Sequence, residues 1–117
     1  MINKRKVGSK WEEMACLYLS KRGYKILERN FYIKGGEADI IALDGEDLCF
    51  VEVKYRANNN YGFSLEAVDS VKMSNLIKVA RYYTYSHKKY ENCNIRFDCL
   101  GIDGEEITLI KGAFDAF

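Results

Sequence analysis

The stretch from Glu37 to Arg56 constrains the fold most, because it contains two β-strand patterns separated by a short polar turn. Residues 37–43 and 48–56 are rich in aliphatic and aromatic side chains, which favour strands. The sequence DGED between them consists of residue types that form tight turns. We therefore predict that these two strands pair as an antiparallel hairpin.

Charged side chains gather on one face of this predicted hairpin. Successive residues of a strand point to opposite faces, so Glu52, Lys54 and Arg56 share one face of the second strand. Glu37 and Asp39 share one face of the first strand for the same reason. The hairpin should thus carry three carboxylates and two cations along two neighbouring strands.

Two registers are open for this hairpin, depending on the centre of the turn. A turn centred on residues 45–46 places Asp39 opposite Glu52, whereas a turn centred on residues 44–45 places Glu37 opposite Glu52. The carboxylates stay on one face in both registers, because the alternation of side chains survives a shift of two in the pairing.

Opposed carboxylates point to a divalent cation. Like charges on paired strands destabilise a sheet unless a cation or a proton relieves them, and carboxylate oxygens suit Mg²⁺ or Mn²⁺. Lys54 would place an amine beside the attacking water or the phosphate, as phosphodiester hydrolysis requires. We predict that Asp39, Glu52 and Lys54 are catalytic, the two acids as metal ligands. The structural alternative is a cross-strand salt bridge of Lys54 with Glu52 or Glu37.

The other predicted elements complete a single domain over residues 1–117. Apolar spacing and turn residues predict a helix over 9–22, a strand over 24–31, a helix over 69–86, and a final hairpin of strands 94–102 and 106–111. We read Ser9 and Glu12 as a capping box at the start of the first helix. This order predicts an α/β (α+β) fold with a mixed sheet flanked by helices.

Composition excludes several classes of protein. We find no apolar run of about 20 residues, and no apolar segment follows the basic N-terminus, so we expect a cytoplasmic protein without a membrane span. The cysteines lack the spacing of a zinc site, so we expect four free thiols, at Cys16, Cys49, Cys93 and Cys99.

Charge is distributed unevenly along the chain. Counting Lys and Arg against Asp and Glu gives net +6 for residues 1–34, −6 for 35–71, +5 for 72–96 and −4 for 97–117. An acidic centre between basic flanks suits a metal site bordered by phosphate-binding surfaces, although ordinary solvated charge would give the same pattern.

Motifs along nearly the whole chain resemble the bacterial YraN family of endonuclease-like proteins, within the PD-(D/E)XK nuclease superfamily. They are KWEEMACLYLSKRGY, ILERNF, GGEADIIA, FVEVKYR, the helix with Lys72, IRFDCLGI and the C-terminal AF. The resemblance implies a restriction-endonuclease-like core. It also implies that Glu12 joins Asp39 and Glu52 as a catalytic residue and metal ligand. The chain departs from the family at Trp11, where a glycine is common, and this change concerns local packing.

Further residues complete the predicted site. We predict that Glu37 lies beside the metal ligands and orients Lys54, rather than binding the metal itself. Lys72, at the start of the long helix, is a candidate phosphate contact. Arg56, Lys78 and Arg81 are candidates for contacting nucleic acid, although helix charges are usually solvated.

These observations predict an endonuclease that uses Mg²⁺ or Mn²⁺ to cut DNA, with branched or junction DNA as a candidate substrate. DNA rather than RNA follows from the resemblance alone. A homodimer would bring two centres to a symmetric junction. Two alternatives keep the fold without catalysis: a nucleic-acid-binding module and a protein-interaction domain.

Overall fold

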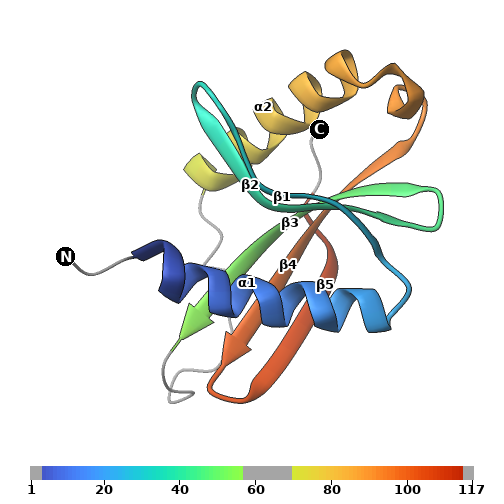
Figure 1. Ribbon diagram of the computed structural model, residues 1–117. Helices are drawn as coiled ribbons and strands as arrows, with labels where there is room; N and C mark the ends of the chain where they lie inside the picture. The colour runs from blue at the N-terminus through green and yellow to red at the C-terminus, as the bar shows by residue number, and fades with distance from the viewer. Residues whose placement is uncertain (1–3, 57–69, 115–117) are drawn as a thin grey trace.

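A computed structural model describes residues 4–56 and 70–114, with side chains over residues 10–55 and 70–114 (Figure 1). The elements are α1 (Lys4–Lys21), β1 (Lys25–Ile33), β2 (Gly36–Asp44), β3 (Asp47–Arg56), α2 (Ser70–Ser86), the short 3₁₀ helix η2 (Lys88–Tyr90), β4 (Asn94–Asp103) and β5 (Glu106–Phe114). Within the described residues neither α-helix is long and apolar enough to cross a membrane.

The strands form one mixed sheet in the order β1-β2-β3-β4-β5, which confirms the predicted fold class. Strands β3 and β4 run parallel, and α2 lies in the connection between them, while the other neighbours are antiparallel. Asp44 pairs with Asp47, so the turn between β2 and β3 is centred on residues 45–46. Gly45 there has φ +60°, which suits glycine because it has no Cβ.

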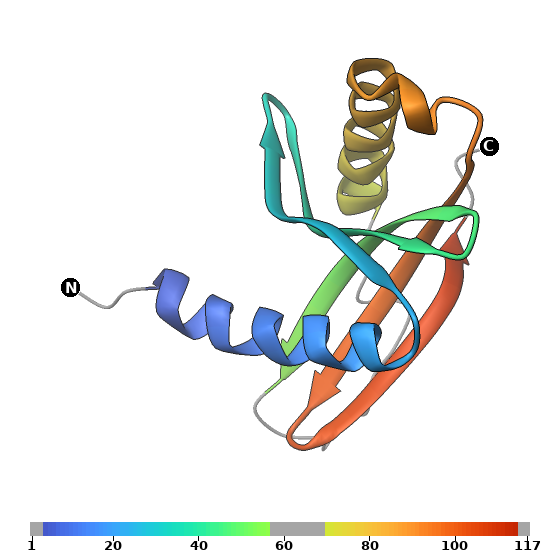
Figure 2. The same cartoon turned by 45° about the vertical axis from the view of Figure 1, so that its right-hand side comes forward.

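Helix α1 covers one face of the sheet and α2 covers the other, as the two views show (Figures 1 and 2). Alternation along β3 divides its side chains between two cores. Val51 packs with Leu19 on the α1 side, and Phe50 packs with Leu76 and Tyr83 on the α2 side. The chain thus buries both faces of its central strands.

The far end of the β1–β2 hairpin leaves the sheet and lies beside α2 (Figure 2). The two strands stay paired out to Ile33 and Gly36, but β2 pairs with β3 only from Ile40 to Asp44. A Cβ built on Gly36 would lie 2.8 Å from the Asn75 carbonyl oxygen of α2, so any side chain here would force the hairpin or α2 to shift. Strands β2 and β3 therefore separate beyond Ile40.

The helix start is the largest error in the predicted boundaries. Helix α1 begins at Lys4 rather than residue 9, so Ser9 lies inside the helix and the capping box with Glu12 is wrong. Strand β5 continues to Phe114, three residues beyond the prediction. The other described ends agree within two residues, and residue 69 lies outside the described part. All four cysteines are free thiols, as predicted.

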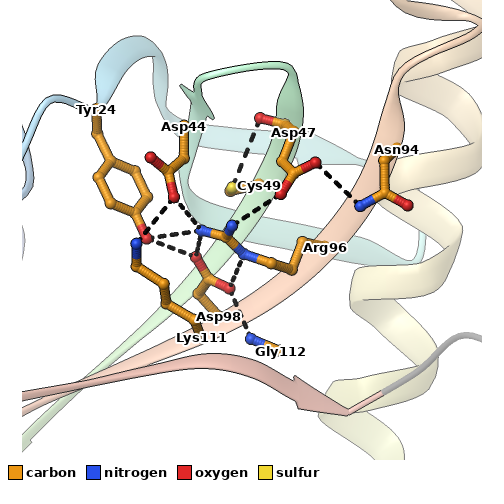
Figure 3. Close-up of polar contacts among 9 residues, drawn as sticks. All are labelled: Tyr24, Asp44, Asp47, Cys49, Asn94, Arg96, Asp98, Lys111 and Gly112. Atoms are coloured by element: carbon orange, nitrogen blue, oxygen red, sulfur yellow. Dashed lines mark hydrogen bonds and ion pairs between the residues drawn. The ribbon is translucent and has the colours of Figure 1, made fainter.

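A polar cluster near the turn between β2 and β3 joins side chains of β2, β3 and β4, and Lys111 of β5 also contacts it (Figure 3). Arg96 on β4 is its centre: its guanidinium binds Asp44, Asp47 and Asp98 at 2.8–3.0 Å. The side chain of Asp98 is fully buried and also accepts a hydrogen bond from the Tyr24 hydroxyl. These contacts fix β2, β3 and β4 relative to one another at the turn end of the sheet.

Candidate metal centre

Asp39 lies at the point where β2 separates from β3. The last pair of the ladder is Ile40 with Val51. If the ladder continued by one more position, Asp39 would lie opposite Glu52. Beyond this pair, the Val53 N–H donates a 2.8 Å hydrogen bond to Oδ2 of Asp39. The carboxylate therefore takes the place of a backbone acceptor where the ladder ends.

Asp39 and Glu52 affect one another through their charges. Glu52 is buried, at 8% exposure, and burial followed by repulsion from Glu52 raises the pKa of Asp39 to about 7. The Val53 N–H opposes this rise, because it stabilises the charged form. A partly buried carboxyl group with a pKa near neutrality is typical of a functional site.

Two lysines supply positive charge to the same place. The Lys72 ammonium, from the first turn of α2, donates a 3.0 Å hydrogen bond to Oε1 of Glu52. Burial and then the nearby Lys72 lower the pKa of Lys54. Burial opposes the charge on Lys72, but its contacts with Lys54 and Glu52 outweigh that effect and raise its pKa. The pKa of Lys72 is therefore higher than that of Lys54.

Glu12 approaches this group, although its hydrogen bond is made elsewhere. Its Oε2 accepts a 2.6 Å hydrogen bond from Nδ2 of Asn30, yet its charge contributes to the raised pKa of Asp39. Over the described ranges 4–56 and 70–114, we find no three Asp, Glu, His or Cys side chains placed to hold one metal ion. The role of Glu12 as a third ligand stays a prediction.

Trp11 fixes the segment of α1 that carries Glu12. Its ring stacks on Tyr55 of β3 with centroids 3.7 Å apart and planes inclined by 16°. The stack joins the helix to the strand that carries Glu52 and Lys54. The residue in which the chain departs from the YraN pattern is thus a packing contact.

The remaining predicted residues lie at different distances from the group. Glu37 is exposed and contributes to the raised pKa of Asp39, but no hydrogen bond or ion pair joins its described side chain to Lys54. Lys78 and Arg81 are exposed on α2. With about 100° of rotation per residue, they lie on the side of α2 away from Lys72. The side chain of Arg56 lies outside the described residues.

The acidic pair fits a small divalent cation. Asp39 and Glu52 offer carboxylate oxygens, the ligands that Mg²⁺ and Mn²⁺ prefer, and Mg²⁺ commonly uses only one or two carboxylates together with waters and phosphate oxygens. Their mutual repulsion, seen in the raised pKa of Asp39, is what a cation would relieve. We call Asp39, Glu52 and Lys54 the candidate metal centre.

The ion pair between Lys72 and Glu52 is the feature that sequence reasoning missed. Lys72 was a predicted phosphate contact, and nothing linked it to a particular acid. A signal was present, because Lys72 shares the helical row of Leu76, Val79 and Tyr83, which are at most 2% exposed and face the sheet. A lysine on such a row is expected to have a charged partner below it.

Residues 11–102 match the uncharacterised protein family UPF0102. A UPF0102 protein of Fusobacterium nucleatum is 46% identical over 110 residues, covering 94% of this chain and 92% of that protein. Another, from Caldanaerobacter subterraneus subsp. tengcongensis, is 45% identical over 94% of this chain and 91% of its own length. A third, from Carboxydothermus hydrogenoformans, is 43% identical, covering 90% and 88%.

Proposed function

The chain belongs to the uncharacterised protein family UPF0102, and we propose that it is a divalent-metal-dependent endonuclease that hydrolyses DNA phosphodiester bonds. The observation that carries this proposal is the placement of Asp39, whose pKa is raised to about 7, beside Glu52, whose charge also acts on the amine of Lys54. The family-level resemblance predicted from the motifs is confirmed, whereas membership of the PD-(D/E)XK superfamily is part of the proposal.

Each residue of the centre has a distinct task in this reaction. Asp39 and Glu52 would hold Mg²⁺ or Mn²⁺, with Glu12 as a further ligand. A cation there would lower the pKa of a bound water and neutralise the charge that develops on the phosphate. Lys54 orients the attacking water, and its lowered pKa leaves more of the amine in the neutral form that can accept a proton than in an exposed lysine.

Positive charge on α2 supports a polyanionic substrate. The helix contains Lys72, Lys78 and Arg81 but no Asp or Glu. Since Lys78 and Arg81 face away from the centre, they would contact the backbone of DNA that extends past it rather than the scissile phosphate. Such contacts position nucleic acid without reading its sequence, which agrees with a preference for DNA structure over DNA sequence.

Cleavage assays test the proposal directly. The purified protein is incubated with Mn²⁺ and linear, nicked and four-way DNA, with a single-stranded RNA as a comparison. We expect cleavage of at least one DNA in Mn²⁺ and none in EDTA. Asp39→Asn and Lys54→Met should each reduce the rate by at least about 100-fold, since they remove a ligand or the proton acceptor.

Lys88→Met is the matched control, because Lys88 is an exposed lysine on η2 outside the centre. It should cut as fast as the wild type. Equal cleavage by wild type, Asp39→Asn and Lys54→Met would show that another nuclease is responsible and would refute the site. DNA binding without cleavage by correctly folded wild-type protein would favour the non-catalytic binding module instead.

A further inference from the structure

Lys72 occupies a position on α2 that would ordinarily carry an apolar side chain. Positions 72, 76, 79 and 83 form the row that faces the sheet, and the last three are the buried Leu76, Val79 and Tyr83. The β3 residue below Lys72 is Glu52, which continues the α2-facing row of Leu48 and Phe50. The ion pair therefore replaces an apolar contact at the end of this core.

The two partners differ in their freedom to move. The Glu52 side chain is 11% exposed and comes from the central strand, so it is held in place. The Lys72 side chain is 42% exposed and has four methylene groups, so its ammonium can turn toward solvent while the stem stays on the sheet. The contact can open on the Lys72 side without disturbing the strand.

Lys72 also occupies the electrostatic position that a divalent cation would need. Its ammonium lies 3.0 Å from an oxygen of Glu52, and Lys54 is close enough to have its pKa lowered by it. A divalent cation on the same carboxylate would add two positive charges beside two amines. The side chain of Lys72 is long and more exposed than that of Glu52. Lys72 is therefore the partner that would move away when a cation binds Glu52.

We infer that Lys72 is an internal counterion that holds Glu52 in the metal-free protein, is displaced from it when a divalent cation binds, and then binds a substrate phosphate. This inference rests on the candidate metal centre proposed above. The inference implies that cation binding and phosphate binding are coupled. A phosphate that binds Lys72 strengthens cation binding, and the cation strengthens phosphate binding by the same factor. The centre should thus bind its cation more tightly when DNA is present than when it is absent.

Calorimetric titration with Mn²⁺ alone, without nucleic acid, tests the competition between Lys72 and the cation. Lys72→Met removes the charge and keeps a side chain of similar length, so it should bind Mn²⁺ about tenfold more tightly than wild type. Lys88→Met, which removes an exposed charge elsewhere, should match the wild type. Glu52→Gln should abolish binding in either background. A thermal melt of each variant establishes that it is folded, and Lys72→Gln provides the same test if Lys72→Met is not.

DNA binding supplies a second measurement that does not depend on activity. Affinity for a linear duplex is measured against salt concentration, in EDTA and in Ca²⁺, a cation that takes the same oxygen ligands. One more phosphate contact steepens the slope of log affinity against log salt by about 0.9. We expect wild type to exceed Lys72→Met by about that amount in Ca²⁺ and to equal it in EDTA.

The outcomes separate this inference from the proposed function. If wild type binds Mn²⁺ and Glu52→Gln does not, but Lys72→Met binds with equal or lower affinity, Lys72 only orients Glu52 and the inference is overturned while the metal centre stands. If neither wild type nor Lys72→Met binds Mn²⁺ at millimolar concentration, the metal centre itself is refuted. Tighter binding by Lys72→Met supports both.

Discussion

Replacing Asp39 with asparagine should stabilise the metal-free protein at neutral pH, even though it removes a proposed catalytic residue. Asp39 has an ordinary pKa of 3.8 that rises to about 7 in the folded protein, because burial and Glu52 disfavour its charge. The asparagine side chain would be neutral, and its oxygen would still accept the hydrogen bond from the Val53 N–H. The substitution therefore removes the unfavourable charge and keeps the favourable contact.

The size of the effect follows from the shift. About three pKa units at 1.36 kcal/mol each give about 4 kcal/mol as the upper limit of the gain in unfolding free energy at pH 8. Between about pH 3.8 and 7 the folded protein binds more protons than the unfolded chain, so wild-type stability falls as pH rises through this window. The asparagine of the variant cannot titrate, and the advantage of Asp39→Asn should vanish below about pH 4.

Urea unfolding of wild type and Asp39→Asn from pH 4 to 8, in EDTA, measures this directly. Asp44→Asn is a matched control of opposite sign, because Lys111 and Arg96 lower the pKa of Asp44 and its loss should destabilise the protein at neutral pH. Millimolar Mn²⁺ should then raise the melting temperature of wild type but not of Asp39→Asn. A variant no more stable than wild type at pH 8, or a difference independent of pH, would refute the electrostatic reasoning.

Three further predictions concern the scaffold. Arg96→Met leaves the fully buried Asp98 without its cation and should cost about 3–5 kcal/mol in urea unfolding, and adding Asp98→Asn should recover much of it. Gly36→Ala places a Cβ against the Asn75 carbonyl and should cost about 1–3 kcal/mol; a neutral result would mean that the hairpin can move away from α2. The lowered pKa of Asp44 should make wild-type stability fall as pH drops below 3.8 through its folded value, and Asp44→Asn should flatten that part of the pH profile.

The sequence predicted the central hairpin well because its determinants are local. Alternating apolar residues assign the faces of β2 and β3, and of the two registers that the sequence leaves open, the structure shows the one with the turn centred on residues 45–46, from Ile40 to Asp44. The same alternation placed Glu52 and Lys54 on one side of β3. The side-chain alternation and the turn depend on residues close together in the sequence, so contacts with distant residues rarely change them.

Features that depend on distant residues were beyond such reasoning. The register predicts that Asp39 lies opposite Glu52, but nothing local shows that β2 leaves β3 at this point or that Asp39 accepts the Val53 N–H. The start of α1 at Lys4 was missed because Ser9 and Glu12 match a capping box, a pattern that also occurs inside helices. The Arg96 cluster joins residues up to 74 positions apart in sequence, as in the hydrogen bond from Tyr24 to Asp98.

The separation of β2 from β3 connects the stability of the fold to the candidate metal centre. The end of the β1–β2 hairpin packs against α2, with Ala38 in the α2 core and Gly36 against its backbone, and this packing draws β2 away from β3. Because the strands separate, the Val53 N–H donates its hydrogen bond to the side chain of Asp39. The same helix α2 brings the Lys72 ammonium to the carboxylate of Glu52. One interface thus sets the position of both acids and of their counterion. Arg96 holds the register at the opposite end of β3, so the hairpin end can shift without loss of the sheet. Small changes in the packing of α2 should therefore alter cation binding before they unfold the protein.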